Sequence, residues 1–202
     1  MVDVLVVVAV DGERDALLAA SPDLRVLVGG VGPAAAAAAT SAELAVRSTG
    51  LVISAGVGGG FVPLAQGDIA VAAAIVFADL GAESPDGFLP VSELGFGTER
   101  YDVEAKLAVE LADRTGGHLG TVLTVATVTG TAARASALAD RFPDAVAEAM
   151  EGAGVAAAAA RHGVPFGEIR AVSNPVGPRD RSAWQLPAAM AALGRAISEA
   201  LS

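Results

Sequence analysis

The sequence predicts an α/β fold, a three-layer α/β/α sandwich with a mixed, mostly parallel central sheet. Short runs rich in β-branched residues alternate with longer helical stretches along the chain, which is typical of helices covering a mainly parallel sheet. The first run, Val4–Val10, is apolar throughout, and such a strand needs cover on both faces. The chain has 202 residues, 53% of them hydrophobic, so we expect a single domain over residues 1–202.

The expected strands are short and mostly apolar. They are Val2–Val10, Arg25–Val28, Leu51–Ala55, Asp68–Phe77, Gly120–Ala126 and Glu168–Ser173. The expected helices are alanine-rich or amphipathic, and they are Ala34–Arg47, Val103–Arg114, Ala145–Arg161 and Trp184–Leu201. The one long irregular segment, Leu80–Thr98, is rich in proline and glycine. Because long loops are usually functional or disordered, we expect this segment to cover a substrate.

Composition and charge restrict the class of partner. With 23 acidic against 13 basic residues the net charge is −10, which repels a nucleic-acid backbone and favours a small molecule. The chain has no cysteine, which excludes disulfides and thiolate metal sites. No apolar stretch is long enough to span a bilayer. Asp3 precedes Val4–Val10 without any basic residue, which argues against a signal peptide, so we expect a cytoplasmic protein with no membrane partner.

Candidate polar residues follow the carboxyl ends of the predicted strands, where α/β sheets form their sites. Glu13 follows the first strand, Gly56–Gly60 the third, Val128–Gly130 the fifth and Asn174 the last. The glycines allow a ligand to approach the backbone closely. Glu13 is either a base that takes a proton from water or an ordinary first-turn acid favoured by the helix dipole.

A second group of polar residues lies on either side of an alanine-rich helix. Met150-Glu151 places a carboxylate within an apolar surface, and the strand that ends at Asn174 carries Arg170. A buried carboxylate needs hydrogen-bond donors. The vicinal hydroxyls of a ribose are such donors and a nearby arginine is another, and both possibilities stay open.

Other chemical motifs are incomplete or missing. The segment Gly30–Ala35 fits a relaxed dinucleotide-binding pattern, but Ser54 and Ala55 stand where the next strand would need to end in an acid. His118 and His162 lie apart at predicted helix ends or turns, where metal ligation is not expected. Neither a Walker loop nor a G-x-S-x-G elbow occurs. We expect neither a metal nor an organic cofactor.

The motifs together resemble the purine nucleoside phosphorylase and nucleosidase superfamily, and within it the futalosine hydrolases. The matching segments occur in a consistent order: Ala9–Glu13, Gly30–Gly32, Ser54–Gly59, Gly67–Ile69, Phe142-Pro143, Met150-Glu151, Val164–Phe166, Arg170–Asn174 and Pro175–Trp184. The resemblance implies a nucleoside phosphorylase/nucleosidase-like fold, an N-glycosyl hydrolase activity on a purine nucleoside, and a homo-oligomer.

The resemblance also implies roles for single residues. Glu13 activates the attacking water, and the pair Met150-Glu151 holds the ribose hydroxyls. Arg170 orients either the water or the carboxylate that activates it. The backbone at Gly58 and Val128 contacts the substrate, with Val128 beside the purine ring.

Two departures from the family pattern refine the expected function. Nucleosidases for methylthioadenosine and adenosylhomocysteine have an aspartate where this chain has Asn174, and a carboxamide NH₂ donates to purine N7 or to a 6-oxo group but meets the adenine amine poorly. Val57 stands where phosphorylases carry a serine or threonine beside phosphate, which favours water as the nucleophile. The resemblance therefore implies hydrolysis of the N-ribosidic bond of futalosine, releasing hypoxanthine, in menaquinone biosynthesis.

Three alternatives stay open. The chain could be another purine nucleosidase, acting on inosine or on methylthioadenosine and adenosylhomocysteine. It could be a non-catalytic nucleoside-binding protein, or a dinucleotide-dependent oxidoreductase using Gly30–Ala35. If the chain is a nucleosidase, the proton for the leaving base comes from solvent or from Asp180.

Overall fold

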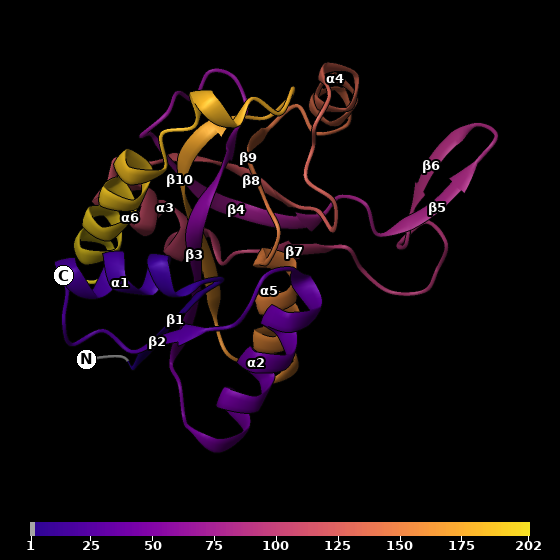
Figure 1. Ribbon diagram of the computed structural model, residues 1–202. Helices are drawn as coiled ribbons and strands as arrows, with labels where there is room; N and C mark the ends of the chain where they lie inside the picture. The colour runs from indigo at the N-terminus through magenta and orange to yellow at the C-terminus, as the bar shows by residue number, and fades with distance from the viewer. Residues whose placement is uncertain (1–2) are drawn as a thin grey trace.

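The computed structural model describes residues 3–202 and confirms the α/β class (Figure 1). The strands are β1 (Val4–Val8), β2 (Val26–Val28), β3 (Leu51–Gly60), β4 (Ile69–Phe77), β5 (Gly81–Ser84), β6 (Gly87–Pro90), β7 (Arg100–Asp102), β8 (His118–Thr124), β9 (Ala145–Ala149) and β10 (Phe166–Pro175). The α-helices are α1 (Asp11–Ala20), α2 (Pro33–Val46), α3 (Ala105–Thr115), α4 (Ala132–Arg141), α5 (Gly152–Arg161) and α6 (Leu186–Ala200), and a 3₁₀ turn spans Arg181–Ala183. Val2, with which the first predicted strand begins, lies outside the described residues.

The main sheet closes on itself, so the expected three-layer sandwich needs correction. β3 and β10 pair in parallel along their length. From β10 the ring continues to β4 (antiparallel), β8 (parallel) and β9 (parallel), and β9 returns to β3 (antiparallel). β1 and β2 extend from β3, and β7 pairs with β4. Register shifts interrupt three of these pairings, and such irregularities bend strands as closure requires.

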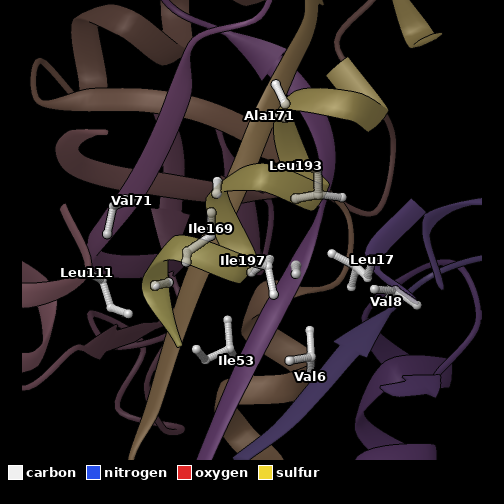
Figure 2. Packing of buried hydrophobic residues seen from close by; sticks show 14 of the residues in the cluster. Val6, Val8, Leu17, Ile53, Val71, Leu111, Ile169, Ala171, Leu193 and Ile197 are labelled. Carbon is white, nitrogen blue, oxygen red and sulfur yellow. The ribbon is translucent and has the colours of Figure 1, made fainter. Parts of the chain in front are cut away.

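Helices pack against the sheet in two groups. α1 and α3 each contact α6 on one side, while α2 and α5 form a second pair. Figure 2 shows the core beneath the first group, where Leu193 and Ile197 of α6 meet Ile169 of β10, Ile53 of β3 and Leu17 of α1. These five side chains are fully buried. This core fixes the positions of β1, β3 and β10, whose carboxyl ends carry the candidate site.

The predicted helix Ala145–Arg161 is wrong in its first part. Residues Ala145–Ala149 form β9, which pairs with β8 on one side and with β3 on the other. Helix α5 begins only at Gly152, with Glu151 as its N-cap. Alanine favours helices locally, but the pairing with two neighbouring strands overrides this preference.

The segment Leu80–Thr98 also differs from the expectation of a substrate-covering loop. It contains the hairpin of β5 and β6, which projects from the body of the molecule (Figure 1). None of residues 80–98 lines the main cavity described below. Within this chain the segment therefore does not cover the candidate site.

Candidate active site

A cavity of about 310 Å³ lies at the carboxyl ends of the strands. It brings together six of the seven predicted site residues, namely Glu13, Gly58, Val128, Met150, Glu151 and Asn174. The seventh, Arg170, lies behind the cavity wall and is not among the lining residues. Convergence of parallel strand ends explains why residues so distant in sequence meet here.

Glu13 is held by backbone amides. It lies in the first turn of α1 and is 3% exposed. Its Oε2 accepts hydrogen bonds from the backbone N–H of Ala9 at 2.9 Å and of Val10 at 3.3 Å, and its Oε1 accepts one from Val57 at 2.9 Å. Backbone donors of this kind stabilise an ionised carboxylate in a fixed orientation. Glu13 is therefore more than a first-turn acid at the surface, because it is fixed in the cavity wall.

Gly56 leaves the space in which Glu13 and Arg170 approach each other. A Cβ atom at this position would lie 2.5 Å from Arg170 Nη1 and 2.6 Å from Glu13 Oε1. Any side chain here would separate the two groups. The sequence predicted that the glycines of β3 allow a ligand to approach the backbone. At Gly56 the groups that approach the backbone are instead the side chains of Glu13 and Arg170.

Arg170 is the centre of a buried network. It is 1% exposed. Its Nε donates to Glu168 Oε1 at 2.8 Å, its Nη2 donates to Ser54 Oγ at 2.9 Å, and its Nη1 lies 3.3 Å from Glu151 Oε2. The resemblance left two roles for Arg170, to orient the attacking water or to orient a carboxylate. This geometry fits the second role, because Arg170 contacts carboxylates and does not line the cavity.

Burial and the neighbouring charges shift the pKa values in this network in opposite directions. Burial by itself lowers the pKa of Arg170, but the carboxylates of Glu168, Glu151 and Glu13 outweigh it and raise that pKa. Burial likewise raises the pKa of Glu168, although its pairing with Arg170 counteracts the shift. Glu168 Oε2 has no hydrogen-bond partner among residues 3–202. Arg170 therefore stays charged and offsets the acids around it.

Glu151 combines the two possibilities that the sequence left open. It forms the ion pair with Arg170, and it also lines the cavity. Its Oε1 accepts from the backbone N–H of Gly32 at 3.2 Å, and its Oε2 accepts from that of Met150 at 3.3 Å. These distances are at the long end of the usual range. The carboxylate is oriented but not saturated, which leaves lone pairs for a ligand hydroxyl.

Asn174 lines the cavity farther along β3 than Glu13 does, because it pairs with Gly59 whereas Glu13 accepts from the backbone N–H of Val57. It lies within β10 rather than after it. Its Oδ1 accepts from the hydroxyl of Ser173 at 2.8 Å, and its Nδ2 donates to the carbonyl of Pro175 at 2.9 Å. Ser173 Oγ also lies 3.2 Å from the carbonyl oxygen of Gly58, so its single hydroxyl proton is shared between two acceptors. Local bonds thus fix the amide, and one of its two N–H groups remains for a ligand.

Sequence reasoning missed several residues of this cavity. Glu148 and Thr129 line it beside Asn174, and Arg179 and Trp184 line it from the loop before α6. The guanidinium of Arg179 lies 5.7 Å from the ring centroid of Trp184. Glu148 lay within the mistaken helix prediction, so no signal pointed to it. Arg179 and Trp184 lie in the segment Pro175–Trp184 quoted for the family resemblance, and Thr129 lies in Val128–Gly130, which follows the fifth predicted strand.

Asp180 does not line the cavity. It caps the 3₁₀ turn, where its carboxylate accepts from the backbone N–H of Ser182 at 3.0 Å and from the hydroxyl of the same residue. The hydrogen bond from the Ser182 side chain lowers the pKa of Asp180. A carboxylic acid with a lowered pKa is a poor proton donor near neutral pH, so solvent is the better source for the leaving base.

Neither a metal cluster nor a membrane span is found in the described part of the chain. No three His, Cys, Asp or Glu side chains among residues 3–202 gather where they could hold a metal ion. No helix over the same residues is both long and apolar enough to cross a bilayer. His162 lies beside Ser41, with 3.0 Å between Nε2 and Oγ.

The closed mixed sheet and the acidic cavity at its strand ends define a class of enzymes that act on nucleosides, and comparison with known proteins agrees. A model of the phosphorylase superfamily matches residues 6–202. The chain therefore belongs to the phosphorylase superfamily.

Within this superfamily, two futalosine hydrolases are similar in sequence. The protein from Streptomyces coelicolor is 52% identical, with 96% of this chain and 93% of the relative covered. The protein from Acidothermus cellulolyticus is 48% identical, with 86% of this chain and 73% of the relative covered. The resemblance to futalosine hydrolases is thereby confirmed.

Two solved structures show the same fold. A 5′-methylthioadenosine/S-adenosylhomocysteine nucleosidase from Neisseria meningitidis, in complex with methylthio-immucillin-A, has a TM-score of 0.86 and 18% identity, covering 100% of this chain and 99% of that one. A futalosine hydrolase from Helicobacter pylori has a TM-score of 0.83 and 18% identity, covering 99% and 97%. At such low identity these structures establish the fold only.

Proposed function

We propose that this enzyme hydrolyses the N-ribosidic bond of futalosine and releases hypoxanthine. The observation that carries this proposal is the division of one cavity into an acidic end, with Glu13 and Glu151, and an end lined by the carboxamide of Asn174. Similarity to two futalosine hydrolases supports the choice of substrate. We also propose menaquinone biosynthesis as the pathway, on the strength of the same resemblance.

Glu13 acts as the general base. Its carboxylate is ordered by three backbone N–H groups and faces the cavity. A water bound there gives a proton to Glu13 as it attacks the anomeric carbon, while the bond to the purine breaks through an oxocarbenium-like transition state. General-base assistance of this kind contributes about 10²–10⁴ in rate.

Glu151 and Met150 hold the ribose. The Glu151 carboxylate accepts hydrogen bonds from the 2′- and 3′-hydroxyls, and the thioether of Met150 covers the sugar face. Arg170 acts as a positioning residue, because it contacts Glu151 from behind without reaching the cavity. Its positive charge orients the Glu151 carboxylate through the ion pair.

Asn174 selects the base. Its free N–H donates to N7 or O6 of a 6-oxopurine, whereas an adenine amine at the same place would meet a second donor. The base leaves as an anion stabilised by this amide or takes a proton from solvent. Val57 and Gly58 offer no hydroxyl for phosphate at the other end, which supports water as the nucleophile.

Assembly and location extend the proposal. We propose a homo-oligomer that works in the cytoplasm. The resemblance to the nucleoside phosphorylase and nucleosidase superfamily supports this assembly. Light scattering on the purified protein measures the oligomeric state, and a monomer at micromolar concentration contradicts this part.

The decisive experiment is a substrate panel. The purified protein is incubated with futalosine, inosine and methylthioadenosine, and the free bases are separated by chromatography. We expect hypoxanthine from futalosine at the highest kcat/KM. Release of adenine from methylthioadenosine at a higher kcat/KM favours the other nucleosidase activity, and no release from any substrate contradicts catalysis.

A further inference from the structure

Glu148 is a buried acid in the cavity that none of the steps above uses. It lies on β9, is 3% exposed and lines the same cavity as Asn174. A buried carboxylate without a structural partner of opposite charge is costly. Its presence in a ligand cavity therefore requires an explanation.

The strand register places Glu148 and Asn174 on either side of Gly59. Asn174 of β10 pairs with Gly59 of β3, and Gly59 pairs with Glu148 of β9. Directly paired residues on neighbouring strands direct their side chains to the same face. The two polar side chains therefore flank a position that has none, and their Cα atoms are roughly 10 Å apart, two strand spacings.

Gly59 allows an apolar side chain to pack against the backbone between Glu148 and Asn174. A Cβ atom there would lie 2.9 Å from Val176 Cγ2 and 3.5 Å from Asn174 Nδ2. The floor between Glu148 and Asn174 is thus the Gly59 backbone with the side chain of Val176 against it, and Val176 also lines the cavity. A planar ring fits over such a floor with one polar side chain at each edge.

The hydrogen bonds of Glu148 leave acceptor capacity toward the cavity. Its Oε1 accepts from the backbone N–H of Thr129 at 2.8 Å, and its Oε2 accepts from the hydroxyl of the same residue. Each carboxylate oxygen retains one lone pair. Arg134, whose charge favours ionisation of Glu148, forms its own ion pair with Asp79 at 3.2 Å. Burial raises the pKa of Glu148, and the hydrogen bonds from Thr129 only partly offset this.

We propose that Glu148 accepts a hydrogen bond from N1–H of a 6-oxopurine while Asn174 donates to its N7 or O6. This inference rests on the proposed function and names a second residue that determines its base specificity. A 6-oxopurine presents a donor at N1 and an acceptor at O6, whereas adenine presents an acceptor at N1 and a donor at its amine. An acceptor at Glu148 matches N1–H of the 6-oxopurine and opposes N1 of adenine. A donor at Asn174 matches O6 and opposes the adenine amine where it faces position 6, whereas at N7 it meets an acceptor in both bases.

The test compares binding of hypoxanthine with binding of 1-methylhypoxanthine by titration calorimetry. The two bases share N7 and O6 and differ at N1. We expect the wild-type protein to bind hypoxanthine about 10- to 100-fold more tightly, the range for a hydrogen bond to a charged group. In Glu148→Ala the ratio should approach one, because the acceptor is gone and the methyl group has room. In the matched control Asn174→Ala both bases should weaken by a similar factor, leaving the ratio unchanged.

The outcomes separate this inference from the proposed function. If the wild-type protein releases hypoxanthine from futalosine but Glu148→Ala keeps the wild-type ratio, the role of Glu148 is wrong and the function stands. If the wild-type protein neither releases nor binds hypoxanthine, the proposed function itself fails. Should Glu148→Ala not fold, Glu148→Gln replaces it. Its NH₂ can donate to adenine N1, so preference for hypoxanthine over adenine should fall about tenfold, and an unchanged preference overturns the inference.

Discussion

The two ends of the cavity hold their carboxylates in different ways. At the acidic end, Glu13 accepts three backbone hydrogen bonds, and Glu151 is paired with the buried Arg170. At the base end, Glu148 has only the two donors of Thr129 and no ion pair with any described residue. The carboxylate of Glu151 thus has a counter-charge within the fold, whereas that of Glu148 has none among the described residues.

This difference fits the roles that we propose for the two ends. A base that activates water must be ionised and oriented before the substrate arrives, so its donors belong to the protein. A group that distinguishes one purine from another gains specificity when it is left unpaired by the wrong base. The predictions below test whether the two ends behave in these separate ways.

The largest effect is expected from Glu13→Gln. Loss of the base should lower kcat for futalosine about 10²- to 10⁴-fold, measured as hypoxanthine release. The matched control Asp11→Asn changes an acid in the same helical turn that pairs with Arg14 at the surface, and it should turn over near the wild-type rate. Thermal melts check that both variants fold. Near-normal turnover of Glu13→Gln would remove Glu13 from the mechanism.

Arg170→Met should have the largest effect on stability. It leaves Glu168 and Glu151 without their shared cation, and loss of one partner from a buried ion pair costs about 3–5 kcal/mol. The control Arg14→Met breaks exposed pairs with Asp11 and Asp15, which are worth about 0–1 kcal/mol. Urea denaturation measures both free energies of unfolding. Equal losses in the two variants would show that the network around Arg170 is not a structural element of the acidic end.

The sequence predicts Glu13 and Asn174 better than Glu148, for physical reasons. Glu13 and Asn174 lie near the carboxyl ends of strands that are apolar enough to be recognised by their local pattern. The ends of parallel strands converge, so their proximity follows from the fold class. Which residues face one another across the closed sheet depends on register, and register is not a local property.

Two wrong predictions and one missed residue share this dependence on strand register. Ala145–Ala149 is locally as helical as the stretch after it, and only its pairing with β8 and β3 makes it a strand. Glu148 lies in this stretch and was therefore not among the predicted site residues. Closure through the pairing of β3 with β10 likewise joins residues far apart in sequence, so an open sandwich was the natural expectation. The burial of Glu168 depends on Gly152, where a Cβ would lie 2.1 Å from its carboxylate.

A smaller effect is expected from Asn174→Asp, which changes base preference without changing shape. A carboxyl group accepts from the adenine amine, so the ratio of kcat/KM for futalosine over methylthioadenosine should fall about 10- to 100-fold. Chromatography of the two released bases measures this ratio. If the ratio stays at the wild-type value, Asn174 does not select the base, and the contrast between the two ends of the cavity weakens.

The smallest expected effect is the contribution of Glu148 to the pH dependence of the free energy of unfolding. Burial raises the pKa of this carboxyl above its ordinary value of 4.5, so the folded protein retains the proton to higher pH than the unfolded chain does. The contribution of Glu148 to the free energy of unfolding is therefore fully present below pH 4.5 and is lost as pH rises through the folded pKa. Glu148→Gln does not titrate, so relative to wild type it should gain stability as pH rises from about 5 to 8.

Urea denaturation across this pH range measures the gain, and Glu168→Gln is the matched comparison. Burial raises the pKa of Glu168 as well, but Glu168 is paired with Arg170. Ionisation of Glu168 is thus compensated within the fold, and its replacement removes an ion-pair partner from a buried arginine. We therefore expect Glu168→Gln to stay below wild type at neutral pH, where Glu148→Gln gains. If the stability of both variants follows the wild-type curve in parallel, the charge of Glu148 is compensated within the fold as well as that of Glu168. The proposed difference between the two ends is then wrong.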